Sequence, residues 1–291
     1  MCVPNKINKK QLIVNIKNGI WNDGSGDAYY IIINGGDLEI RSDPNTGATR
    51  NIFVNLTPED GVPANRTIRI FQSGTDHEII HNACRDNSGN LYNAIRFGTQ
   101  VWTAANLKTE HFRNGDVIPY NPGSTSTNPG RFYPQGGVSY VEDYGYLYNW
   151  AAVMDTRGLT PTGWHIPSTE EYNTLLNFIK NHPAFLSDGS NQNYNGKCLA
   201  YTSEWSTSST SYAVGNAQSL NNCSGFSAIP AGLWSSGSST RRSYDINLWT
   251  TTEDSSNSSN AMRWRINYNN TYLYSASVSK TYGHSIRLIK D

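Results

Sequence analysis

The order of apolar and polar positions divides the chain into two regions with different patterns. Up to about residue 76, short segments rich in Ile, Val, Tyr and Phe alternate with Gly, Asn, Asp and Pro. This pattern predicts a small all-β sandwich, because β-branched and aromatic residues favour strands while the separating residues favour turns. The predicted strands are QLIVNI (11–16), AYYIIIN (28–34), DLEIRS (37–42), RNIFVNLT (50–57) and RTIRIFQSG (66–74).

The second region, residues 77–291, combines strands with two predicted helices. One helix is expected over 146–154, and a clearer one follows Ser168, which forms an S-x-x-E capping box with Glu171. Pro183 marks the end of this helix, and no helix signal returns after it. The predicted apolar stripe of the second helix consists of Tyr172, Leu175, Leu176 and Ile179. The fold class expected for this region is α+β.

A turn and a strand open the second region. Asn87-Ser88-Gly89-Asn90 has the composition of a turn, and the residues after it alternate through Tyr92, Ala94 and Arg96. We expect this strand to continue to Trp102.

Composition and charge exclude two classes of partner. The chain has 23 Lys and Arg against 23 Asp and Glu, so the basic excess typical of a nucleic-acid binder is absent. No apolar run approaches the ~20 residues needed to span a membrane. The first residues also lack the apolar segment of a signal peptide.

Six blocks of sequence resemble a known family. The blocks are GNLYNAIRFGTQVWTAANL, YGYLYNWAAV, PTGWHIPSTEEYNTLL, SGFSAIPAG, LWTTTE and GHSIRLIKD. In this order they are similar to the Fibrobacter succinogenes major paralogous domain family, over about residues 84–291. The resemblance implies a C-type-lectin-like fold for the second region. The stretch 50–74 resembles the end of immunoglobulin-like modules in surface proteins of gut Bacteroidetes, such as Bacteroides. It implies an immunoglobulin-like module over residues 1–76, followed by the lectin-like domain over 77–291.

The chain departs from the family at two places. The family usually has Met-Ala-Glu-Asn where this chain has Thr103-Ala104-Ala105-Asn106, and Leu288 replaces its near-terminal Cys. We expect the large rings and glycines of the blocks to hold the fold without doing chemistry. These residues are Trp102, Trp150, Trp164, Phe226, Trp249, Gly145, Gly163, Gly225 and Gly283.

The sequence contains one metal-site motif and lacks another. His77-Glu78-Ile79-Ile80-His81 matches the H-E-x-x-H motif of zinc metallopeptidases, which requires a helix that puts both His on one face. The motif falls instead at the junction of the two regions, so a linker strand is the expected structure. Calcium-binding lectins use Glu-Pro-Asn or Gln-Pro-Asp, and neither occurs here. We therefore expect no catalysis, no metal and no cofactor.

Ser, Asn and Tyr make up nearly half of residues 235–284. Antibody paratopes favour the same types, because Tyr provides a large contact at low entropic cost while Ser and Asn provide adaptable hydrogen bonds. Short segments that match the family scaffold, such as PAG and WTTTE, interrupt this mixture. The whole resembles the variable proteins of diversity-generating retroelements. Their C-terminal repeat is randomised at adenines. A soluble β-rich surface with ordinary loops is the alternative.

Strand alternation separates an apolar set from a ligand-facing set. Met262, Trp264, Ile266 and Tyr268 should face the core, which leaves Arg263, Arg265 and Asn267 for solvent or ligand. The resemblance to variable proteins adds Leu233, Trp234, Arg241, Arg242, Tyr244, Asp245, Asn247, Tyr272, Tyr274, Tyr282 and His284. We expect a shared, largely exposed face from Leu233, Tyr244, Arg263, Arg265, Tyr272, Tyr274 and Tyr282.

The function expected from these observations is ligand binding outside the cell. The C-terminal face would bind a protein or glycan on another cell. The chain itself would be either a bacterial surface adhesin or a phage receptor-binding protein. Cys198 and Cys223 fit either a disulfide or free buried thiols, since their spacing matches no zinc pattern.

Overall fold

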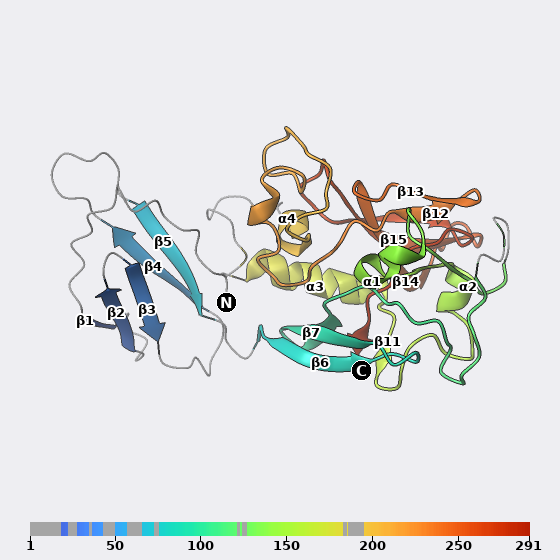
Figure 1. Cartoon of the computed structure of the whole chain (residues 1–291), viewed down its shortest axis with the longest axis horizontal. Helices are drawn as coiled ribbons and strands as arrows, with labels where there is room; N and C mark the ends of the chain where they lie inside the picture. Colours follow the sequence, from blue (N-terminus) through green and yellow to red (C-terminus); the bar gives the residue numbers. More distant parts are fainter. Residues whose placement is uncertain are drawn as a thin grey trace. The chain divides into compact units, whose positions relative to one another are not determined.

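The computed structural model describes residues 76–120, 123, 127–182, 185 and 195–291 with their side chains, and the backbone of five strands between residues 19 and 72. The chain divides into two compact units, Met1–His77 and Glu78–Asp291 (Figure 1). The boundary expected from the sequence lies after residue 76.

The strands of the first unit form two antiparallel sheets. One sheet has the order β1-β2-β3, and the other pairs β4 with β5. The bounds are β1 Gly19–Asn22, β2 Ala28–Asn34, β3 Asp37–Ser42, β4 Arg50–Leu56 and β5 Arg66–Gln72. The strands β2 to β5 coincide with four predicted strands, whereas β1 was not predicted and residues 11–16 lie outside the described residues. The immunoglobulin-like assignment of this unit stays a prediction.

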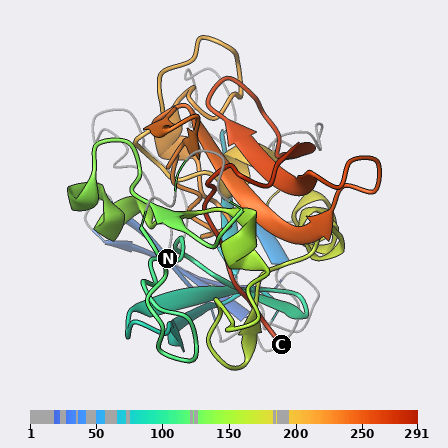
Figure 2. The same cartoon turned by 90° about the vertical axis from the view of Figure 1, so that its right-hand side faces the viewer.

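The second unit contains a five-stranded antiparallel sheet in the order β11-β17-β8-β7-β6. Its strands are β6 Ile79–Arg85, β7 Leu91–Phe97, β8 Gln100–Thr103, β11 Trp164–His165 and β17 Ile289–Lys290. In Figure 2 the dark red C-terminal segment runs down to the teal strands, where Ile289 pairs with Trp102. The single strand predicted from Tyr92 to Trp102 is wrong, because a turn at Gly98, whose φ is +61°, divides it into β7 and β8.

A second sheet carries the C-terminal half of the unit. It is antiparallel in the order β14-β15-β16, and two small two-stranded sheets, β12–β13 and β9–β10, accompany it. The bounds are β9 Arg131–Phe132, β10 Leu147–Tyr148, β12 Leu233–Ser235, β13 Ser238–Thr240, β14 Asp245–Glu253, β15 Asn260–Asn267 and β16 Tyr274–Ser279. The described part is therefore a mixed α/β structure with mostly antiparallel sheets and few helices.

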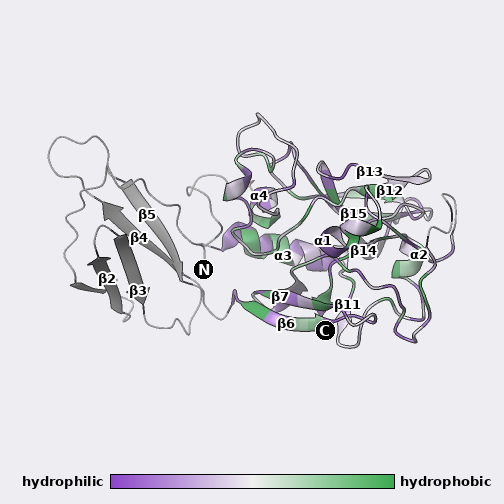
Figure 3. Ribbon diagram, viewed as in Figure 1, coloured by the Kyte–Doolittle hydropathy of each residue, from purple (hydrophilic) through white to green (hydrophobic). Residues whose placement is uncertain are grey.

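The longest helix is α3, Thr169–Asn181, and its predicted start is confirmed. The Ser168 side chain accepts from the Glu171 amide, and the Glu171 side chain accepts from the Ser168 amide. All four residues of the predicted apolar stripe are buried. Figure 3 shows hydrophobic and hydrophilic residues alternating along this helix. Amphipathic packing of this kind stabilises a helix more than its intrinsic propensity does.

Two helix predictions were wrong. The helix expected over 146–154 is reduced to α2, Trp150–Val153, because Leu147–Tyr148 forms β10 and a separate α1 covers Val141–Tyr144. The sequence also gave no helix after Pro183, whereas α4 covers Asn195–Leu199. Short 3₁₀ turns occur at Val138–Tyr140 and Gln218–Leu220. No helix in the described part of the chain is both long enough and apolar enough to cross a bilayer.

The predicted scaffold rings form the core. Trp102, Trp150, Trp164, Phe226 and Trp249 are all buried, as expected. The Trp102 ring lies between Tyr172 of α3, at 4.9 Å, and Phe226, at 6.1 Å between ring centroids. Gly145 adopts a φ of +75°, which favours glycine. Gly283 is required for a different reason, since a Cβ there would lie 2.8 Å from the Phe132 ring.

Candidate binding face

The strands β14, β15 and β16 project one set of the predicted residues from the same face of their sheet. Directly opposite residues in an antiparallel pair share a face. The cross-strand pairs of β14 and β15 on this face are Asp245–Asn267, Asn247–Arg265 and Trp249–Arg263. Tyr274 of β16 lies opposite Arg265 and joins the same face. The sheet therefore brings together residues that are up to about thirty positions apart in sequence.

Asp245 is the centre of the polar contacts on this face. Its side chain is fully buried and accepts hydrogen bonds from the side chains of Arg241, Arg265 and Asn267. The distances are 2.6 Å from Arg265 Nη2 and 2.6 Å from Asn267 Nδ2. The Asp245 carboxylate holds the pKa of Arg241 above its usual value. A single buried carboxylate thus fixes two arginine side chains in place.

Tyrosine rings surround these arginines. Tyr272 and Tyr274 contact each other edge to face with centroids 5.9 Å apart, and the Arg265 guanidinium lies 5.8 Å from the Tyr274 ring centre. The Arg241 guanidinium lies 5.8 Å from the ring of Tyr244. Tyr244 and Tyr272 are 45% and 46% exposed, so about half of each ring is free for contact with a partner. We call this set the arginine–tyrosine face; it comprises Arg241, Tyr244, Asp245, Arg263, Arg265, Asn267, Tyr272 and Tyr274.

The largely exposed face expected of seven residues is found only in part: Tyr244 and Tyr272 are exposed, whereas Leu233, Arg265, Tyr274 and Tyr282 are half-buried and Arg263 is buried. Arg263 was expected to be largely exposed but is only 8% exposed, and its Nε and Nη1 atoms have no hydrogen-bond partner among the described residues. Burial and the neighbouring charge of Arg265 lower the pKa of Arg263 to about 10. Of the four residues expected to face the core, Trp264 and Ile266 are buried, whereas Met262 and Tyr268 are half-buried.

Four further predicted ligand-binding residues are also buried: Trp234, Asp245, Asn247 and His284. The His284 ring lies 4.4 Å from Trp249, the residue opposite Arg263, and neither ring nitrogen of His284 has a partner in the described part. Burial, followed by the charge of Arg263, lowers the pKa of His284 well below its usual value, so this ring is neutral. These side chains lie beneath the surface at which a ligand first makes contact.

Other predicted residues point elsewhere. The Trp234 ring stacks on Phe132 at 3.9 Å, as part of a small hydrophobic cluster. The Arg242 guanidinium lies 3.9 Å from the Tyr140 ring centre, outside the arginine–tyrosine face. Leu233 and Tyr282 are half-buried, and Tyr282 packs against a core cluster. These residues support the face or lie beside it.

The sequence reasoning missed a groove of about 550 Å³. Tyr140 and Tyr144 contribute to it, and the Tyr144 hydroxyl donates to Glu204 at 2.7 Å. The lining residues are Ala104, Ala105, Tyr140, Glu142, Asp143, Tyr144, Tyr201, Ser203, Glu204, Ser227 and Ile229. Tyr140 and Tyr144 were not singled out by the sequence pattern, and the only local signal is their proximity to the acidic residues Glu142 and Asp143.

The H-E-x-x-H motif does not form a helical site. Asp76 and His77 form a turn, and His81 lies on β6. Glu78 pairs with Arg96 at 2.8 Å. Within the residues that the structure describes, no group of three or more His, Cys, Asp and Glu side chains is placed to hold a metal ion.

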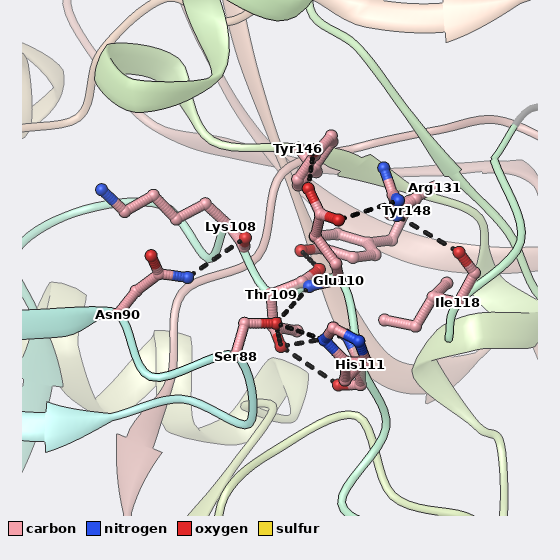
Figure 4. Close-up of polar contacts among 10 residues, drawn as sticks. All are labelled: Ser88, Asn90, Lys108, Thr109, Glu110, His111, Ile118, Arg131, Tyr146 and Tyr148. Carbon is pink, nitrogen blue, oxygen red and sulfur yellow. Dashed lines mark hydrogen bonds and ion pairs between the residues drawn. The ribbon is translucent and has the colours of Figure 1, made fainter. Parts of the chain in front are cut away.

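A second polar network surrounds Glu110 and His111 (Figure 4). Ser88 Oγ lies 3.0 Å from His111 Nδ1 and accepts from the Glu110 amide at 2.8 Å. Glu110 in turn accepts from the Tyr146 hydroxyl at 2.5 Å and from Arg131 Nη2 at 3.2 Å. The Glu110 carboxylate therefore binds Tyr146 and Arg131 and does not orient the His111 ring. A serine nucleophile needs such an oriented base, so this network fits a structural role.

The structure joins Cys198 of α4 to Cys223 in a disulfide, which decides between the two alternatives left by the sequence. Cys84 is the free cysteine of the described residues. Burial raises the pKa of the Cys84 thiol to about 12, so this residue is unreactive at neutral pH.

Comparison with known proteins identifies the family. No curated protein and no solved structure matches the chain. The family model of the Fibrobacter succinogenes major domain matches residues 95–290, which include both sheets of the second unit from β8 onward and the whole arginine–tyrosine face. The chain therefore belongs to the Fibrobacter succinogenes major domain family.

Proposed function

We propose that the chain is a non-enzymatic binding protein whose arginine–tyrosine face binds a protein or glycan on the surface of another cell. The observation that carries this proposal is the gathering of partly exposed Tyr and Arg side chains over a rigid, buried core. Tyr and Arg are enriched among the residues that dominate binding energy in interfaces. Because Asp245 already holds Arg241 and Arg265, little side-chain freedom is lost when a ligand binds.

The proposal includes a C-type-lectin-like fold and a place among the variable proteins of diversity-generating retroelements. The sequence resemblance and the mixed antiparallel architecture support the fold. The concentration of Tyr, Ser, Asn and Arg on segments between residues 233 and 284 supports the variable face. The chain would act outside the cell, on a bacterial surface or a phage virion. A reverse transcriptase and a template repeat beside the gene would support the retroelement assignment, and tail genes would support the phage setting.

Binding of the labelled chain to intact bacterial cells tests the proposal. The double variant Tyr272→Ser/Tyr274→Ser should lose binding, since it removes the exposed Tyr272 ring and the half-buried Tyr274 ring that contacts it. Its melting temperature should stay within a few degrees of the parent, because partly exposed residues contribute little to the core. Tyr120→Ser is the matched control, since Tyr120 is 49% exposed and lies outside the face. Equal binding by the Tyr272/Tyr274 variant would refute the proposal.

A further inference from the structure

Three arginines of the described residues are at least nine-tenths buried, and two of them, Arg287 and Arg131, have hydrogen-bond partners on two or more of their nitrogens. Arg287 donates from Nε to Asn106 Oδ1 at 2.8 Å, from Nη1 to the Thr103 and Phe226 carbonyls at 2.8 Å, and from Nη2 to the Ser227 carbonyl at 2.7 Å. This fold thus satisfies a fully buried guanidinium on all three nitrogens. Arg287 is a structural residue by this measure.

Arg131 is also paired, through two of its nitrogens. Its Nε donates to the Ile118 carbonyl at 3.2 Å, and its Nη2 pairs with the Glu110 carboxylate at 3.2 Å. The guanidinium also lies 4.6 Å from the Tyr146 ring centre. Figure 4 shows these contacts. A buried charge is tolerated here because a carboxylate and a ring face it.

Arg263 is the exception. Two of its three nitrogens, Nε and Nη1, have no partner in the described part, although the residue is 8% exposed. Its side chain does form a hydrogen bond with the Tyr274 side chain. An incompletely paired buried charge is costly, so it is retained where another group pairs with it in a functional state.

The charges around Arg263 are not balanced. Arg241, Arg263 and Arg265 carry three positive charges, and Asp245 supplies one negative charge. Both oxygens of Asp245 are already taken, Oδ2 by Arg241 and Oδ1 by Arg265 and Asn267. His284 is neutral and supplies no charge of either sign. The face therefore keeps an excess of positive charge next to two unused donors.

We propose that Arg263, with Arg265 beside it, binds the carboxylate of an Asp or Glu side chain projecting from a partner protein. The inference rests on the proposed function of this face and names the group that the face recognises. A guanidinium and a carboxylate form two parallel charge-assisted hydrogen bonds, either from Nε and Nη2 or from Nη1 and Nη2, so a carboxylate would give one of the two unused donors of Arg263 a partner. A fully desolvated pair of this kind is typical of interface hot spots.

Geometry favours a protein side chain over an acidic sugar. Arg263 is 8% exposed and bonds to the Tyr274 side chain, while Arg265 and Arg241 have side chains that are 21% and 44% exposed and meet an approaching anion first. A carboxylate on one or two methylene groups can reach a recessed guanidinium, whereas a carboxylate attached directly to a sugar ring extends less. Rotation of the half-buried Tyr274 side chain opens the way, and such rotations are fast at protein surfaces.

Titration of the full chain with N-acetyl-glutamate amide tests the contact directly. The arginine Nε–H resonances are followed by ¹⁵N NMR at constant ionic strength, and the uncharged N-acetyl-glutamine amide is the control ligand. We expect a saturable shift of the Arg263 Nε–H signal with the glutamate compound alone. No shift, or the same shift with the glutamine compound, would overturn the proposal.

Two variants separate a binding role from a structural one. Arg263→Met should abolish the response to the glutamate compound while the melting temperature stays equal or rises, because an unpaired buried charge is replaced by an apolar chain of similar length. Arg287→Met should lower the melting temperature strongly, because it removes four hydrogen bonds. If Arg263→Met destabilises the fold as much as Arg287→Met, Arg263 is structural and the proposal is wrong.

Polymeric ligands and cells complete the test. Poly-L-glutamate should bind the full chain and bind Arg263→Met about 30-fold more weakly, as expected for a hot spot of about 2 kcal/mol. Arg96→Gln, on β7, is the control variant and should bind like the parent. Binding of polygalacturonate but not poly-L-glutamate would overturn the assignment to a protein.

If cell binding depends on Tyr272 and Tyr274 but not on Arg263, the proposed function stands and this inference fails. If glutamate binds at Arg263 but the chain binds no cells, this inference stands and the proposed function fails.

Discussion

His165 shows how partners decide the ionisation of a single residue. It lies on β11 between two carboxylates, with Nε2 2.7 Å from Glu171 and Nδ1 2.7 Å from Asp291. Burial of the ring opposes protonation, but the hydrogen bonds to Glu171 and Asp291 outweigh it and raise the pKa of His165. The protonated ring therefore stabilises the fold below the unfolded pKa of about 6.5, and this contribution is lost as the pH rises through the raised folded pKa.

We predict that His165→Gln destabilises the protein more at about pH 5.5 than at about pH 8.5. The measurement is the free energy of unfolding of parent and variant by denaturant titration at both pH values. Asp291→Asn removes one of the two partners, on a side chain that is 59% exposed. It should reduce the pH dependence in part. An equal loss at both pH values would show that the charge on His165 does not contribute.

Arg263 shows the limit of sequence reasoning at this scale. Alternation along 262–268 correctly separated two faces of a strand, and it correctly assigned Trp264 and Ile266 to the core. It could not show that side chains from elsewhere in the chain also bury Trp249 and Arg263 on the opposite face. One of these is His284, which a β-bridge to Tyr148 holds in place. Contacts between residues so far apart in sequence leave no local signal.

At the scale of single elements, α3 depends on its N-terminal cap. The Ser168 hydroxyl accepts from the Glu171 amide, and Glu171 returns a bond to the Ser168 amide. We predict that Ser168→Ala lowers the free energy of unfolding by about 1 kcal/mol. Thr174→Ala on the same helix is the control, because its hydroxyl bonds only to a carbonyl one turn back, Glu170, on an exposed surface. A loss within about 0.5 kcal/mol is expected for the control.

The disulfide fixes α4 against the loop that leads to Phe226. Cys198 and Cys223 are 25 residues apart, and a cross-link across such a loop typically contributes about 3 kcal/mol. We predict that Cys198→Ser/Cys223→Ser lowers the free energy of unfolding by this amount. Reducing agent should destabilise the parent and leave the double variant unchanged. Cys84 is a free thiol, so a reductant has no disulfide to break there. If reductant also destabilises the double variant, its effect on the parent does not come from the Cys198–Cys223 disulfide alone.

Elements were predictable where local and tertiary signals agree. α3 has a cap, a stripe with helical spacing and sufficient length, so both its start and its buried face could be derived from the sequence. Residues 146–154 are aromatic and apolar as well, but β10 pairs Leu147 with Phe132 and extends the backbone there. Tertiary pairing overrode helix propensity in that segment. α4 was missed because its five residues carry too short a pattern.

At the scale of the whole molecule, each unit has its own sheets. The second unit also has its own core, since the residues of its three hydrophobic clusters all lie between Cys84 and Ile289. The sequence located the change of pattern near residue 76, because strand spacing in the first region and helix signals in the second differ. It could not specify that β17, at the far end of the chain, inserts between β8 and β11.

We predict that residues 78–291 fold without the first unit, because their sheets and clusters close on themselves. A fragment 78–291 should show a calorimetric transition within a few degrees of the corresponding transition in the full chain. A fragment 78–287 should be strongly destabilised, because it lacks Leu288 and Ile289, which are 1% and 3% exposed, and loses β17. Removing β17 leaves β8 and β11 unpaired at an edge and opens a cavity in the core, a loss of about 2–5 kcal/mol for each large side chain. If 78–291 fails to fold while the full chain is stable, the two units depend on each other, and the division at His77 does not mark independent domains.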